Sequence, residues 1–81
     1  MEDAIRSFIA KELITRPELL PIQDDTELIN SGIIDSLALL DLIIFLEDQF
    51  GVIVDTEEAV PKNFDTVNSI SRYVKAKKGR I

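Results

Sequence analysis

The stretch NSGIIDSLALLDLIIFLEDQF, residues 30–50, passes from turn-forming residues into a strongly apolar segment. Asp35 is a favoured residue type for capping the start of a helix, and Gly51 is a favoured type for ending one. One apolar stripe within the segment follows the spacing of helix turns: Leu39, Leu42, Ile43, Leu46 and Phe50. The pattern predicts a helix over Ser36–Phe50 whose stripe faces a small core.

A second apolar strip on the same helix is not needed for that core. It consists of Leu37, Leu40 and Ile44. Acidic side chains fall on the same side of the helix, namely Asp41, Glu47 and Asp48. A face that mixes apolar and acidic residues suggests a docking surface. The alternative is a central helix that is buried nearly all round, which the acidic neighbours disfavour.

The first helix is expected over Glu2–Ile14, because Ile5, Phe8, Ile9 and Leu13 recur at helical spacing. Pro17 blocks its continuation. A loop of about twenty residues then leads to Asp35, and connections of that length are often functional. We expect four of its apolar residues to cover the core: Leu19, Leu20, Ile22 and Leu28.

The second half of the chain predicts two more helices. Asp55–Glu58 has the spacing of a capping box, and Pro61 follows, so a helix of about one turn fits there. A last long helix begins after Asp65 or Thr66 and carries Val67, Ile70 and Val74 on one face. The fold class is therefore all-α, a four-helix bundle with three long helices, one short helix and a long loop between the first and second.

Length and composition exclude several classes of protein. The 81 residues form one small domain, residues 1–81, in which 46% of residues are hydrophobic and 30% are charged. Cysteine and histidine are both absent, which removes the usual nucleophile, general base and metal ligands, so we expect neither catalytic residues nor a metal. No run of apolar residues is long enough to span a membrane. A cytoplasmic monomer is the expectation.

The charge of −6 is unevenly distributed. The segment from Pro17 to Pro61 holds eleven acidic residues and no Lys or Arg, whereas the tail from about residue 75 is basic. The tail's cations are Lys75, Lys77, Lys78 and Arg80. An unbroken negative surface repels nucleic acid and anionic membranes and steers toward basic patches on partner proteins. Solubility alone is the simpler explanation.

Ser36 is the candidate functional residue. The start of a helix presents unpaired N–H groups and the positive end of the helix dipole, which would stabilise a phosphate ester on a serine there. As a nucleophile in its own right Ser36 would be poor, because the chain has no histidine to take its proton. An ordinary first-turn serine is the alternative for an isolated Asp-Ser-Leu sequence.

The extended pattern DDTELINSGIIDSLALLDLIIFLEDQFGVIV, followed by DTEEAVPKNFDTVNSISRYV, resembles the acyl and peptidyl carrier protein family over nearly the whole chain. In that family an aspartate-serine-leucine motif opens the second helix, and its serine receives the 4′-phosphopantetheine arm of coenzyme A. The resemblance implies that Ser36 carries the arm, with Asp35 and Leu37 completing the motif. It also implies a docking role for six residues: Asp35, Leu37, Asp41, Ile44, Glu47 and Asp48.

The resemblance further implies partners and a kind of cargo. A phosphopantetheinyl transferase would attach the arm, an activating ligase would load an acyl or aminoacyl group as a thioester, and a downstream enzyme would accept it. Fatty-acid carriers usually show Gly-X-Asp-Ser and an acid after the leucine. Here two isoleucines separate Gly32 from Asp35, and Ala38 follows Leu37, a pattern more similar to stand-alone carriers such as D-alanyl carrier proteins. Phe45 replaces a residue that is small in many carriers.

Two rival functions belong to other classes. A helical protein–protein interaction module would use the same apolar and acidic face without modification, and Ser36 would be dispensable. A small hydrolase would use Ser36 as its nucleophile, which the missing histidine disfavours.

Overall fold

The computed structural model describes residues 1–14 and 16–79, and every regular element in this part of the chain is helical. The α-helices are α1 (Glu2–Phe8), α2 (Ser36–Phe50), α3 (Pro61–Phe64) and α4 (Val67–Lys78). Three further turns are helical but not α-helical. One is a wider π-helical turn (Ile9–Leu13), and two are tighter 3₁₀ turns (Pro17–Leu19 and Thr56–Glu58). The all-α class is confirmed. The bundle of three long helices and one short helix stays a prediction, since α1 has only seven α-helical residues.

The first helical segment has the predicted extent but not a uniform geometry. The helix α1 widens at Ile9 into the π-helical turn and ends at Ile14, whose backbone is extended. Ile5 and Ile9 are fully buried, as the apolar spacing predicted. The widened turn has no signal in the sequence that we can identify.

The bounds of α2 agree with the sequence prediction at both ends. Asp35 is its N-cap, and Gly51 ends it in the left-handed conformation at φ 69°, which glycine adopts without strain. Leu42 and Leu46 are fully buried on the predicted core stripe. The helix therefore packs against the core through the apolar stripe that its sequence predicted.

A helical turn forms where the short helix was predicted, but its geometry is 3₁₀, and the α-helix that follows it was missed. Thr56–Glu58 forms only a 3₁₀ turn, and the Asp55 side chain makes no capping hydrogen bond. A separate α-helix, α3, begins at Pro61, which the sequence analysis treated as the end of a helix. Proline is favoured at the first position of a helix because its missing N–H would have no partner there.

The last helix, α4, is capped by Thr66, one of the two predicted candidates. The Ser69 N–H donates to the Thr66 hydroxyl oxygen at 3.0 Å. Val67, Ile70 and Val74 are fully buried on the predicted face. Asp65 ends α3 instead of capping α4.

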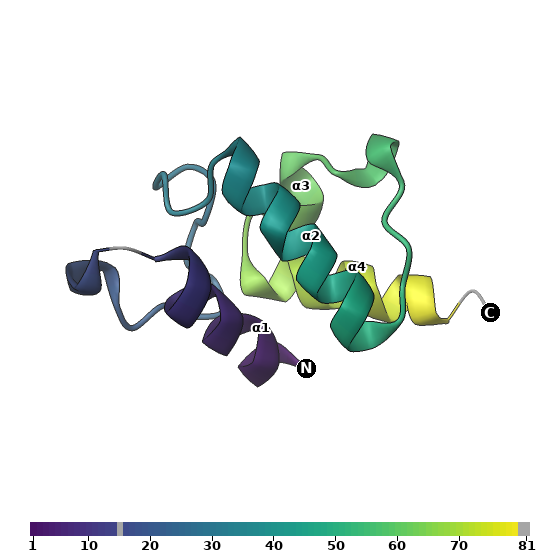
Figure 1. Ribbon diagram of the computed structural model, residues 1–81, viewed down its shortest axis with the longest axis horizontal. Coiled ribbons are helices and arrows are strands. Elements are labelled where there is room, and N and C mark those ends of the chain that lie inside the picture. Colours follow the sequence, from purple (N-terminus) through teal and green to yellow (C-terminus); the bar gives the residue numbers. More distant parts are fainter. Residues whose placement is uncertain (15, 80–81) are drawn as a thin grey trace.

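Contacts between segments far apart in sequence close the core. The helices α1 and α3 both pack against α4, and Figure 1 shows α2 crossing in front of α4 with α1 alongside it. The rings of Phe8 in α1 and Phe45 in α2 stack with centroids 4.2 Å apart, joining these two helices. In the long loop Ile22 and Leu28 are buried as expected, but Leu20 is 41% exposed, contrary to the prediction.

The acidic middle of the chain is not the unbroken negative surface expected from sequence. Arg6 in α1 forms an ion pair with Asp24 in the loop. Lys77 of the basic tail binds Glu58 at 3.0 Å and Asp55 at 3.4 Å. The part of the basic tail at Arg80 lies outside the described residues. Folding thus brings cations from both ends of the chain onto the acidic segment.

Candidate functional site

The loop before α2 is held firmly where it delivers Ser36. Ile33 and Ile34 are buried, and the Ile34 N–H donates to the Leu28 carbonyl oxygen at 2.9 Å. The Leu28 N–H in turn donates to the Asp65 carbonyl oxygen at 2.8 Å. Gly32, at φ 81°, turns the chain just before the two isoleucines. These contacts fix the start of α2 relative to the end of α3.

Asp35 and Ser36 occupy different positions at that start. The Ala38 N–H donates to Asp35 Oδ1 at 2.8 Å, so the Asp35 carboxylate closes the first turn of the helix. Ser36 is the first residue of α2 and is exposed. Leu37 follows with its side chain 75% exposed. The predicted motif therefore presents a hydroxyl and an apolar side chain to solvent at a capped helix end.

The electrostatics of this end favour a negative group on Ser36. In a helix the first N–H groups have no carbonyl partner one turn earlier, and here the N–H of Ala38 is taken by Asp35. The N–H groups of Ser36 and Leu37 remain outside the ladder of bonds within the helix. The positive end of the helix dipole adds to their effect. A phosphodiester on Ser36 would lie in this field.

The chain's other four serines are less suited to carry a group. Ser71 is only 2% exposed, and its hydroxyl donates to Glu2 at 2.9 Å. Ser69 is half-buried in the first turn of α4, where its hydroxyl accepts a hydrogen bond from Thr66. Ser7 is exposed in the last turn of α1, and Ser31 is exposed in the loop. All five serines lie within the described residues, and among them only Ser36 combines exposure with the first position of a helix.

A small apolar pocket of about 220 Å³ adjoins Ser36. Its lining residues come from the loop, the first turns of α2 and the start of α3: Ile29, Ile34, Asp35, Ser36, Leu39 and Pro61. The pocket was not predicted from sequence, because the tertiary fold brings Pro61 against residues 29–39. It offers apolar surface directly beside the hydroxyl.

The second apolar strip of α2 lies on the surface, as its sequence pattern predicted. Leu37, Leu40 and Ile44 are 75%, 54% and 50% exposed. Asp41 and Asp48 are exposed on the same helix. The alternative of a helix buried all round is therefore wrong.

Glu47 lies differently from the other acids of the predicted docking face. It is half-buried, and its Oε2 accepts a hydrogen bond from the Val54 N–H at 3.0 Å. Its carboxylate thus ties α2 to the connector that follows Gly51. The other predicted docking acids are exposed: Asp35, Asp41 and Asp48.

Phe45 lies between α1 and α2, half-buried, and not deep in the core. It stacks on Phe8 and meets the ring of Phe50 edge-on, with centroids 6.2 Å apart. Its bulk therefore fills the contact between two helices. It does not line the pocket beside Ser36.

A polar cluster that the sequence analysis missed joins the 3₁₀ turn at 56–58 to α4. The Tyr73 hydroxyl donates to Glu58 Oε1 at 2.7 Å, and Lys77 Nζ binds the same oxygen at 3.0 Å. The hydrogen bond from Tyr73, together with Lys77, lowers the pKa of Glu58 from 4.5 to about 2. The cluster holds the connector between α2 and α3 in place.

Two further kinds of site are absent from residues 1–14 and 16–79. No three side chains of the types His, Cys, Asp and Glu come close enough together there to hold a metal ion. Within the same residues, no helix has both the length and the apolar character needed to cross a membrane.

Comparison with known protein families matches residues 3–74 to the family described as phosphopantetheine attachment site. The match spans most of the chain, from α1 into α4, and includes the whole of α2 with Asp35, Ser36 and Leu37.

Proposed function

Since this chain belongs to the phosphopantetheine attachment site family, we propose that Ser36 is the residue on which it carries the arm. The family match shows a carrier domain whose cofactor is covalently attached 4′-phosphopantetheine. The observation that supports Ser36 is its position as an exposed hydroxyl at the first residue of α2. Asp35 caps that helix through Ala38, so the hydroxyl itself stays available.

Each part of the site has a task in this proposal. The free N–H groups and dipole of α2 stabilise the negative charge of the phosphodiester that joins the arm to Ser36. The apolar pocket beside Ser36 can receive the methyl groups of the arm next to that phosphate. The thiol at the far end of the arm holds the cargo as a thioester. The protein itself remains a non-catalytic carrier.

We propose an acyl or aminoacyl cargo and three kinds of partner in the cytoplasm. A phosphopantetheinyl transferase attaches the arm, a ligase activates and loads the cargo, and a downstream enzyme accepts it. The two isoleucines between Gly32 and Asp35, both buried, support a stand-alone carrier of an amino acid or other carboxylic acid. The exposed apolar and acidic residues of α2 support docking of basic partner surfaces there.

Arm transfer in vitro tests this proposal. The unmodified chain is incubated with a broad-specificity phosphopantetheinyl transferase, coenzyme A and Mg²⁺, and its intact mass is measured. We expect one arm on the parent chain, one on Ser31→Ala and none on Ser36→Ala. Ser31 is a matched control because it is an exposed serine in the loop just before α2.

A parent chain without added mass would contradict the proposal, provided that the same transferase modifies a known carrier. That result would favour the rival function, an interaction module that uses the exposed strip of α2 without modification. An arm on Ser36→Ala would place the attachment on another residue.

A further inference from the structure

A groove of about 620 Å³ lies between the end of the first helical segment and the outer side of α2. Its floor is apolar and consists of Phe8 and Leu13 from the first segment and Ile44 and Phe45 from α2. The stacked rings of Phe8 and Phe45 make this floor continuous across both helices. Ile44 is 50% exposed here. The groove thus offers apolar surface that a partner could cover.

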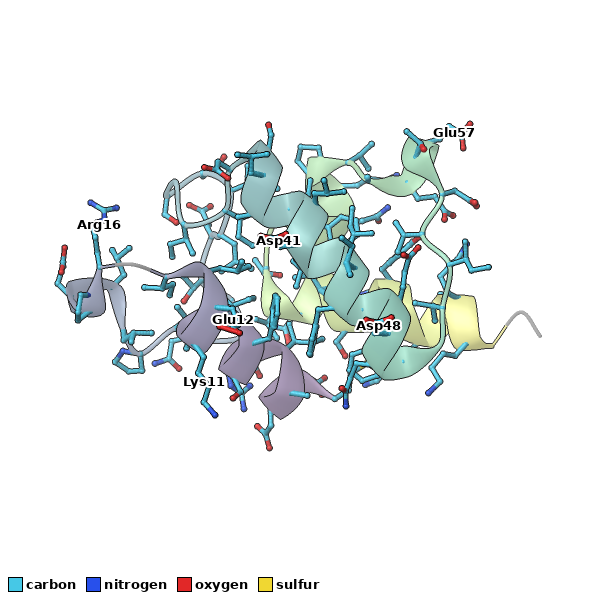
Figure 2. The ribbon with its side chains drawn as sticks, in the orientation of Figure 1. Lys11, Glu12, Arg16, Asp41, Asp48 and Glu57 are labelled. Atoms are coloured by element: carbon cyan, nitrogen blue, oxygen red, sulfur yellow. The ribbon has the colours of Figure 1, made fainter. Side chains whose placement is uncertain are left out.

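The rim of the groove is acidic on both sides. Glu12 stands on one wall and Asp41 and Asp48 stand on the other, and no Lys or Arg lines the groove. Figure 2 shows Glu12, Asp41 and Asp48 on the same face of the molecule, Glu12 beside α1 and the two aspartates along α2. Within residues 1–14 and 16–79 none of the three belongs to an ion pair, whereas Asp24 and Glu58 do. The rim therefore carries uncompensated negative charge.

We propose that this groove binds a cationic amphipathic helix of a partner protein. One large apolar side chain of that helix contacts the apolar residues of the floor. Lys or Arg residues on either side of it pair with the carboxylates of the rim. The charge of the rim selects this occupant, because positive side chains would compensate three carboxylates that have no paired cation within the described residues. A second copy of the chain would bring its own charge of −6 to the groove.

The spacing of the rim residues suits a helix. Asp41 and Asp48 lie seven residues apart, which is about 10.5 Å or two turns along α2. Cations one or two turns apart on an aligned helix would match that separation. The groove between two packed helices also suits a third helix, whose ridge of side chains can lie between them.

This inference rests on the proposed function and extends it to α1. Ile44, Asp41 and Asp48 belong to the docking face proposed above, but Glu12, Leu13 and Phe8 do not. Asp41 lies five residues after Ser36, about 7.5 Å along the helix axis. Ser36 does not line the groove, so a partner helix there would leave its hydroxyl accessible, and the carrier could be held while its arm reaches an active site.

Peptide titration followed by NMR tests the groove. The probe is a synthetic peptide of about 15 residues, long enough to form a helix, with leucines on one face and lysines on the other. A scrambled peptide of the same composition is its control. Both are added to the ¹⁵N-labelled unmodified chain and to Ser36→Ala. We expect the amides of Phe8, Leu13, Ile44 and Phe45 to shift in both proteins and only with the amphipathic peptide.

Two pairs of variants distinguish binding in the groove from attraction to the protein's net negative charge. Glu12→Lys and the milder Glu12→Gln should weaken binding, the charge reversal by about threefold or more. Glu57→Lys and Glu57→Gln make the same changes at an exposed acid outside the groove and should leave the dissociation constant nearly unchanged. Circular dichroism on all four confirms that the helices are intact.

Three results would overturn the inference. The first is an equal loss of binding at Glu12 and Glu57, which would mean attraction to net charge alone. The second is amide shifts that avoid the groove. The third is groove shifts that grow with protein concentration without peptide, which would identify a second copy as the occupant. If the transferase still modifies Ser36 in any of these cases, the proposed function stands and only the groove inference fails.

Discussion

Asp35 and Ser36 are neighbours with separate tasks at the start of α2. The Asp35 carboxylate is committed to the helix, because it accepts the Ala38 N–H at 2.8 Å. The Ser36 side chain is exposed at the first helical position. The division explains why an acid precedes the serine. The acid holds the helix start in shape, and the serine is left free for modification.

Removing the Asp35 cap should therefore affect stability and arm transfer by loosening the first turn of α2. Asp35→Ala should lower the free energy of unfolding by about 1 kcal/mol and slow arm transfer, because the first turn of α2 frays. Asp35→Asn keeps an oxygen that can accept the Ala38 N–H and should retain most of both properties. The measurements are urea unfolding and the rate of arm transfer. Equal stability of Asp35→Ala and the parent would contradict a capping role.

At the scale of elements, α2 has one face for the core and one for solvent. Leu42 and Leu46 are fully buried, and Ile44 between them is 50% exposed. Residues two positions apart in a helix, such as Leu42 and Ile44, point to nearly opposite sides of it. The two faces should respond differently to the same kind of truncation.

Leu42→Ala should lower the free energy of unfolding by about 2–5 kcal/mol, because it leaves a cavity among fully buried side chains. Ile44→Ala should cost less than about 1 kcal/mol but slow arm transfer by the transferase. Urea unfolding and transfer rates measure the two effects. If Ile44→Ala unfolds as easily as Leu42→Ala, the exposed face of α2 is assigned wrongly.

The contact of the 3₁₀ turn at 56–58 with α4 depends on the ionised form of Glu58. Tyr73 and Lys77 both bind its Oε1 and lower its pKa from 4.5 to about 2. A carboxyl whose pKa falls on folding stabilises the folded state above its unfolded pKa. That stabilisation is present above about pH 4.5 and is lost as the pH falls toward 2.

We therefore expect the difference in unfolding free energy between the parent and Glu58→Gln to be largest near neutral pH. It should shrink as the pH is lowered from about 4.5 toward 2. Glu57→Gln, at the adjacent exposed acid, is the matched control and should differ little from the parent at any pH. Urea unfolding across this range measures the difference. A gap between the parent and Glu58→Gln that stays constant with pH would show that the ionised form is not what stabilises the contact.

Local signals explain which elements could be predicted from sequence. Asp35 begins α2 through its side-chain cap, and Gly51 ends it through its left-handed backbone. Thr66 caps α4 through Ser69, three residues away. The start of α3 at Pro61 was missed because proline can either end a helix or begin one. The position of Ser36 followed from the same local reasoning as the bounds of α2.

Long-range features of the site could not be predicted. Tyr73 and Lys77 lie 15 and 19 residues from Glu58, so their hydrogen bonds depend on the tertiary fold. The pocket beside Ser36 and the groove between α1 and α2 depend on it as well, since each is lined by several elements. The half-buried state of Glu47 follows from its bond to Val54, which helical periodicity does not report.

For the whole molecule, the negative charge left without a paired cation is smaller than the sequence indicated. The chain carries −6, but Arg6 and Lys77 bind acids of the segment that has no cations of its own. Other acids, including Glu12, Asp41 and Asp48, take part in no ion pair within residues 1–14 and 16–79. Repulsion among the uncompensated acids should still oppose folding.

Salt should therefore raise the melting temperature. At 0.1 M ionic strength charges are screened beyond about 10 Å, which weakens the repulsion between separated acids more than it weakens the close ion pairs. Thermal melting in NaCl and in KCl, from low to moderate concentration, measures the effect and separates screening from specific ion binding. A melting temperature that falls with salt would mean that the ion pairs of Arg6 and Lys77 outweigh the repulsion.

The most direct test of the carrier function is the mass of the protein purified from its native host. Intact mass spectrometry, followed by fragmentation, reports whether an arm is present and which of the chain's five serines bears it. We predict one 4′-phosphopantetheine on Ser36, and any load on its thiol would identify the cargo. A fully unmodified chain, or an arm on Ser7, Ser31, Ser69 or Ser71, would contradict the assignment of Ser36.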